Sequence, residues 1–176
     1  MPKTLEIISI PDPLLRAPST PIERVDDELR AYLDDMLHTM YEAPGVGLAA
    51  VQVANPIRAI VMDITTREED EPKNPICMIN PEIIELGPEP RLHEEGCLSI
   101  PEVYAEVERP GSARVAYIDR DGKQAEMLCE GFLATVVQHE IDHLDGKLFI
   151  DFLSRLKRDM IVRKFVKAKK ASTTAI

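Results

Sequence analysis

The sequence contains no long uninterrupted hydrophobic run. A membrane-spanning helix needs about 20 consecutive, mostly apolar residues, and no segment of the 176-residue chain approaches that length. The opening residues, Met-Pro-Lys-Thr-Leu-Glu, also lack the apolar stretch of a secretory signal peptide. These absences predict a soluble, unexported protein with no membrane partner.

Cysteine and basic residues are both scarce. Cys77, Cys97 and Cys129 form an odd set without the spacing of a disulfide framework, which suits a reducing cytosol. The 21 Lys and Arg are outnumbered by 31 Asp and Glu, so the net charge is −10. Residues 153–176 nevertheless hold eight basic residues and one acid, so this tail carries +7 and the body −17. An acidic body argues against general nucleic-acid binding, and no specific DNA partner is expected.

The length predicts a single domain spanning residues 1–176. Several prolines within residues 1–25 disfavour regular structure and predict an extended arm there. Apolar residues recur at helical spacing from about Asp26 until Pro44 and Gly45 end that helix. Strands are predicted at 58–63, 77–84, 113–118 and 124–129. This order favours an α+β fold with mainly antiparallel sheets wrapped around a central metal-binding helix, followed by a C-terminal helix.

The basic tail, residues 153–176, is predicted to form that C-terminal helix. Ser154 is a suitable N-cap. The face expected to pack on the body through the first two turns holds Leu153, Leu156 and Met160. The same face then becomes cationic, at Lys164 and Lys167.

A potential metal site appears in the segment 138–146. Residues four apart lie on the same face of a helix, so His139 and His143 can direct two imidazoles at one ion, with Glu140 beside them as a proton acceptor. The preceding apolar run is typical of a buried helix, and Gly146 is suited to end it. Buried imidazoles and a carboxylate are costly without a partner, and a metal is the simplest partner. Taken alone, the pattern also occurs by chance on surface helices.

A catalytic site of this kind needs three protein ligands and one open position. In metzincin proteases a third histidine follows the glycine by three residues, but Phe149 stands there in this chain. No glutamate follows Glu140 to serve instead. Cys97 follows a glycine and precedes a short extended segment, so its thiolate could complete a Cys/His/His set. His93 is the rival candidate for the third ligand.

A segment of small residues, 45–53, contains the amide side chain of Gln52. Small residues let the backbone approach another group closely. The Gly-x-Gly in this segment does not make a nucleotide site, because no phosphate-binding helix start or suitably spaced acid follows it. Alone, a tight turn with a core-facing segment explains the pattern equally well.

Three motifs together resemble the peptide deformylase family. Its members carry Gly-x-Gly-x-Ala-Ala-x-Gln, Glu-Gly-Cys-Leu-Ser and Gln-His-Glu-x-x-His in this order, and this chain has them at 45–52, 95–99 and 138–143. The similarity extends over nearly the whole chain, and the joint match is more specific than any single motif. It implies one catalytic domain that removes the formyl group from the N-terminal formyl-methionine of newly made proteins and releases formate.

The resemblance also implies roles for individual residues. Cys97, His139 and His143 would hold the metal, and Glu140 would act as general base and acid while metal-bound hydroxide attacks the formyl carbon. The side chain of Gln52 and the backbone N–H of Leu98 would form an oxyanion hole. The substrate-binding residues that we expect are Gly45, Val46, Gly47, Phe132 and Val136, with His93 at the pocket rim.

The resemblance implies Fe(II) as the native metal, with zinc as a frequent substitute. The same ligand set also accommodates nickel and cobalt. A nascent formyl-methionyl peptide is the expected substrate, in a bacterial cytoplasm rather than an organelle. The basic C-terminal helix is a candidate contact with the ribosome. Two alternatives are a metallopeptidase that cuts internal bonds and a structural metal domain that binds a partner. The structural site is disfavoured because it usually closes with four protein ligands.

Overall fold

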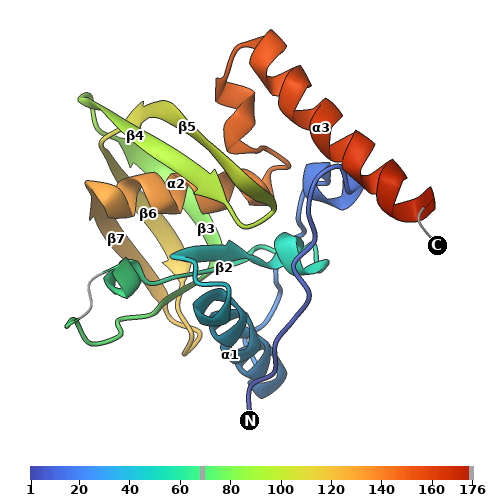
Figure 1. Cartoon of the computed structure of the whole chain (residues 1–176). Helices are drawn as coiled ribbons and strands as arrows, with labels where there is room; N and C mark the ends of the chain where they lie inside the picture. The colour runs from blue at the N-terminus through green and yellow to red at the C-terminus, as the bar shows by residue number, and fades with distance from the viewer. Residues whose placement is uncertain (68–69, 175–176) are drawn as a thin grey trace.

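The computed structural model describes residues 1–67 and 70–174 (Figure 1). The helices in this part of the chain are α1 (Asp27–Glu42), α2 (Phe132–Leu144) and α3 (Arg155–Thr174), with short 3-10 turns η1 (Pro13–Arg16), η2 (Ala50–Val53), η3 (Ile64–Arg67) and η4 (Phe149–Phe152). The strands are β1 (Gly47–Ala49), β2 (Ala59–Met62), β3 (Ile76–Leu86), β4 (Pro90–Cys97), β5 (Ile100–Pro110), β6 (Ser112–Ile118) and β7 (Gln124–Glu130). The four predicted strands correspond to β2, β3, β6 and β7, whereas the β4–β5 hairpin was not predicted.

Two antiparallel sheets surround the central helix. One has five strands in the order β1-β2-β3-β6-β7, and the other is the two-stranded β4–β5 hairpin. Helix α2 lies between the hairpin and the larger sheet (Figure 1). The predicted α+β class, with mainly antiparallel sheets around a central helix, is confirmed.

Helix α2 is buried on most sides, as its apolar sequence predicts. Its residues Val136, Val137, Ile141 and Leu144 belong to one core cluster with side chains of β1, β2, β3, β6 and β7. The helix stops at Leu144 because Gly146 adopts a left-handed φ of +75°, where a Cβ would also meet the backbone oxygen of Arg16. Two histidines on this helix are therefore held in a tightly packed part of the protein.

Helix α1 covers the opposite face of β1 and β2. Asp26 caps it by accepting a hydrogen bond from the Leu29 backbone N–H at 2.9 Å. The N-terminal arm crosses nearby and contains the 3-10 turn η1 within an otherwise extended course. Two of its backbone N–H groups, of Ile8 and Ile10, donate to the backbone oxygens of Gln52 and Ser99. The arm thus supports two of the three motif segments.

Helix α3 forms most of the basic tail. Ser154 caps it by accepting a hydrogen bond from the Lys157 backbone N–H at 3.2 Å. Of the three residues predicted to pack on the body, Leu153 does, but the prediction was wrong for Leu156 and Met160. Leu156 and Met160 are 70% and 60% exposed. The residues that pack against the arm, β5 and η4 are Leu153, Ile161, Val162 and Phe165. The face bearing Leu156, Met160, Lys164 and Lys167 therefore points to solvent. Within the described residues, no helix is both long and apolar enough to cross a bilayer.

Candidate active site

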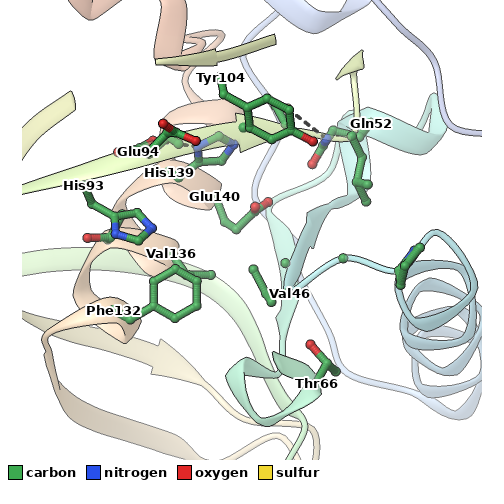
Figure 2. Close-up of a pocket in the computed structure, with 18 residues that line it drawn as sticks. Val46, Gln52, Thr66, His93, Glu94, Tyr104, Phe132, Val136, His139 and Glu140 are labelled. Atoms are coloured by element: carbon green, nitrogen blue, oxygen red, sulfur yellow. Dashed lines mark hydrogen bonds and ion pairs between the residues drawn. The ribbon is translucent and has the colours of Figure 1, made fainter. Parts of the chain in front are cut away.

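A pocket of about 520 Å³ opens where β1, the β4–β5 hairpin and α2 meet (Figure 2). Three stretches supply most of its wall: residues 44–47, residues 93–98 and the inward face of α2. All five residues expected to bind substrate line it, namely Gly45, Val46, Gly47, Phe132 and Val136. The structure therefore brings the three motifs, which are far apart in the sequence, around one space.

Three potential metal ligands converge at the inner end of this pocket. Cys97 Sγ lies 3.4 Å from His143 Nε2, which lies 3.2 Å from His139 Nε2. Ligand atoms of all three side chains lie within 4.8 Å of one another. Both histidines come from α2, one turn apart, while Cys97 ends strand β4. In the part of the chain that the structure describes, these residues form the only group of three metal-binding side chains at such distances.

The donor set fits one divalent cation. Tetrahedral bonds of about 2.0–2.3 Å hold ligand atoms about 3.3–3.6 Å apart, close to the distances seen here. Burial lowers the pKa of His143 well below its usual value, which keeps this imidazole neutral, as a metal ligand must be. Burial also acts to lower the pKa of His139, but hydrogen bonds to Cys97 and Glu95 outweigh it and raise that pKa. The groups around His139 thus favour a positive charge beside its ring. Three ligands leave a fourth position on the metal open.

His139 is oriented by a buried ionic network. Its Nδ1 lies 2.9 Å from Glu95 Oε1, an arrangement that leaves Nε2 facing Cys97 and His143. Arg109 binds Glu95 through two hydrogen bonds of 2.6 and 3.0 Å and reaches Asp142 at 2.8 Å. Burial acts against ionisation of Glu95, yet hydrogen bonds from His139 and Arg109 hold its pKa below the ordinary value.

Sequence reasoning missed Glu95 and Arg109 as supports of the site. Glu95 was noticed only as part of a motif, and Arg109 was not singled out. Both side chains are about 4% exposed, and the ring of Phe152 lies 4.5 Å from the Arg109 guanidinium. Removing one member of such a buried ionic set leaves an uncompensated charge. Their separation of 14 residues on an unpredicted hairpin gave no local signal.

Glu140 lies beside the ligand cluster, 4% exposed, and its side chain extends from α2 toward the strand that follows Val46 (Figure 2). Burial raises the pKa of this carboxyl to about 7. Among the described residues, Glu140 Oε2 has no hydrogen-bond partner. A carboxyl with a pKa near neutrality is suited to proton transfer at physiological pH.

Gln52 and Leu98 border the same space. Gln52 Oε1 accepts a hydrogen bond from the Ala49 N–H at 2.9 Å, and Nε2 donates to Ser99 Oγ at 3.0 Å. The same Nε2 lies 3.5 Å from Cys97 Sγ. Leu98 occupies the tight turn directly after Cys97, between β4 and β5. An amide nitrogen and a turn backbone therefore lie next to the Cys97 sulfur.

The rest of the pocket is largely apolar, from Val46, Phe132 and Val136. His93 lies at this wall, with its ring centroid 5.0 Å from that of Phe132. It is not part of the three-residue ligand cluster. His93 therefore lies at the apolar wall and apart from the ligand cluster.

Comparisons with known proteins agree with the three motifs. The polypeptide deformylase family matches residues 4–159. The peptide deformylase of Mesorhizobium japonicum is 58% identical over 164 residues, covering 93% of this chain and 92% of that protein. That of Agrobacterium fabrum is 55% identical over 165 residues, covering 94% and 96%.

Solved structures show the same fold. The peptide deformylase of Ehrlichia chaffeensis superposes with a TM-score of 0.89 at 37% identity, covering 97% of this chain and 99% of its own. That of Legionella pneumophila gives 0.86 at 42% identity, covering 97% and 98%. Sequence and fold therefore agree over nearly the full length of the chain, which belongs to the peptide deformylase family.

Proposed function

We propose that residues 1–176 act as one catalytic domain that hydrolyses the formyl group from the N-terminal formyl-methionine of nascent proteins in the bacterial cytoplasm. The observation that carries the proposal is the convergence of Cys97, His139 and His143 beside Glu140 in an apolar pocket. A divalent metal on these three ligands would polarise the formyl oxygen and make a bound water easier to deprotonate. We propose Fe(II) as the native metal, with zinc, nickel or cobalt as substitutes.

Glu140 has the position and pKa to move the protons of this hydrolysis. Its carboxylate accepts a proton from the attacking water and later donates it to the departing amine. Because the carboxyl group is buried, its pKa is raised to about 7. It can therefore both accept and donate a proton near neutral pH. The Glu95–Arg109 pair supports this step indirectly by fixing the ring of His139.

Gln52 and Leu98 are proposed to stabilise the negative charge that develops on the formyl oxygen. The bond from the Ala49 N–H to Gln52 Oε1 fixes the amide so that its NH2 group faces Cys97 and Ser99. An N–H held in place before the reaction costs little reorganisation when charge develops. The apolar wall of Val46, Phe132 and Val136 would hold the methionine side chain, with His93 at its rim.

Replacing Gln52 with Ala should lower kcat by about 10²-fold and change KM much less, because the amide acts chiefly on the transition state. Steady-state kinetics on a formyl-methionyl dipeptide measure both constants. Gln124→Ala, which changes an exposed amide on β7, is the matched control and should leave both unchanged. A change confined to KM would make Gln52 a substrate-binding residue only.

Formate release from a short formyl-methionyl peptide tests the function as a whole. Anaerobically purified protein should release one formate per peptide, lose this activity on chelation and regain it with Fe(II). Metal analysis of the same sample identifies the resident ion. Cleavage of internal peptide bonds would instead support the metallopeptidase alternative, and metal binding without hydrolysis would support the structural metal domain.

We also propose that α3 contacts the ribosome. Its solvent-facing stripe combines the exposed Leu156 and Met160 with basic side chains one and two turns further along. A basic helix on an acidic body is an electrostatic docking element for an anionic partner, and the proposed substrate emerges from the ribosome. Such a contact should weaken steeply as salt is raised.

Neutralising the basic end of this stripe and the adjacent exposed Arg163, with Lys164→Gln, Lys167→Gln and Arg163→Gln, should abolish low-salt co-sedimentation with ribosomes and preserve activity on a short peptide. Substitution is a cleaner test than deleting residues 163–176, because Phe165 packs against the core. Three exposed lysines elsewhere, Lys3, Lys123 and Lys147, provide a charge-matched control. Unchanged co-sedimentation of the α3 variant would disprove the contact.

A further inference from the structure

Gly47 lies directly against the side chain of Glu140. A Cβ added at Gly47 would stand 2.8 Å from Glu140 Oε1 and 3.0 Å from both Cδ and Cγ. These are the three nearest atoms to that position, and ordinary van der Waals contacts of a Cβ begin at about 3.4 Å. The carboxylate therefore occupies space that only a glycine at position 47 leaves open.

The backbones on both sides of this contact are held in place. Gly47 is buried in β1 and pairs with Met62 of β2, and the neighbouring Val46 oxygen accepts a hydrogen bond from the Asp63 N–H. On the other side, the backbone of Glu140 belongs to α2, whose Ile141 packs in the core. Added bulk at position 47 must therefore be relieved by the free end of the Glu140 side chain.

The backbone of Gly47 gives no separate reason for glycine. Its φ lies outside the left-handed region, unlike those of Gly122, Gly131 and Gly146. An alanine at this position would therefore not strain the main chain. The substitution would change only the steric contact with Glu140. Displacing the end of that flexible side chain should lower the free energy of unfolding only slightly.

We infer that Gly47 is a positioning residue for the proton transfer. Because it has no side chain, the Glu140 carboxylate can occupy the space next to it. This inference rests on the proposed function, because it concerns the base of the same site. Misplacing a reacting group by about 1 Å can cost about 10²-fold in rate. The first motif, residues 45–52, would thus leave the space that Glu140 of the third motif occupies. This role is in addition to any backbone contact that the first motif makes with the peptide.

Gly47→Ala tests the inference in the purified, metal-loaded enzyme. The variant should keep its metal and its KM within about threefold, while kcat falls by about 10²-fold. In a Glu140→Gln background the same substitution should lower kcat no further, since the group it displaces no longer acts as a base. Gly111→Ala, at a position that does not line the pocket, also places a Cβ close to a neighbour, 3.1 Å from the Glu89 oxygen, and should leave kcat unchanged.

The outcomes separate this inference from the function itself. Wild-type protein without formate release would overturn the proposed function. An active wild type whose Gly47→Ala variant retains normal kcat, or changes only in KM, would overturn the positioning role. An equal loss of kcat in the Glu140→Gln background would also overturn it, because the effect would then not pass through Glu140. Thermal melting of both glycine variants shows whether either has lost its fold.

Discussion

Glu140→Gln should lower kcat by about 10²–10⁴-fold while the protein keeps its fold and its metal. The amide has nearly the same shape as the carboxylate but cannot accept a proton at neutral pH. Because Glu140 is not one of the three converging ligands, the metal site should survive the change. Turnover of a formyl-methionyl peptide and metal content per chain, measured on the same sample, check both parts.

The matched control is Glu130→Gln, an exposed acid at the end of β7. It removes one negative charge from the same acidic body and should leave kcat unchanged. Near-normal turnover of metal-loaded Glu140→Gln protein would show that another group moves the proton. Loss of metal together with activity would instead place Glu140 among the groups that hold the ion.

The parts of the site that sequence predicted are those set by local geometry or by a motif. His139 and His143 face the same way because one helical turn separates them. Gly146 ends the helix because its left-handed φ suits glycine. Phe149 stands where the metzincin pattern has its third histidine, which leaves Cys97 as a candidate third ligand. The nearness of Cys97 to the histidines depends on the whole hairpin, so the local sequence does not indicate it.

The packing of α3 shows where local periodicity fails. Leu156 and Met160 define one apolar stripe, whereas Ile161, Val162 and Phe165 lie on another part of the helix surface. A sequence with apolar residues on two faces does not say which face meets the body. Which face packs depends on the direction in which the chain leaves η4, and that direction is set by the tertiary structure.

The Glu95–Arg109 pair was missed for a different reason. Charged residues are expected at the surface, and nothing local marks these two as buried. Their partnership follows from the β4–β5 pairing, which places Glu95 opposite Ala105 and brings Arg109 back over α2 toward Asp142. Such long-range ionic contacts support the site but become visible only once the hairpin is known.

Cys97→Ala should reduce the metal content to a small fraction of one ion per chain and abolish turnover. The substitution removes the thiolate and leaves two imidazoles, and metal affinity in such sites depends on the full set of deprotonated ligands. The change also removes the sulfur that faces both imidazole rings. Elemental analysis of anaerobically purified protein measures the loss directly.

The other two cysteines make natural controls for this experiment. Cys77 packs at the edge of the α1 core, and Cys129 is fully buried in the core around α2, so neither belongs to the ligand cluster. Burial raises the pKa of the Cys129 thiol to about 11, which keeps it a neutral core side chain. Cys77→Ala and Cys129→Ala should therefore retain a full metal content, even where a lost buried sulfur lowers the melting temperature. A fully loaded Cys97→Ala protein would show that the third ligand is another group, and His93→Ala in that background would then reveal whether His93 supplies it.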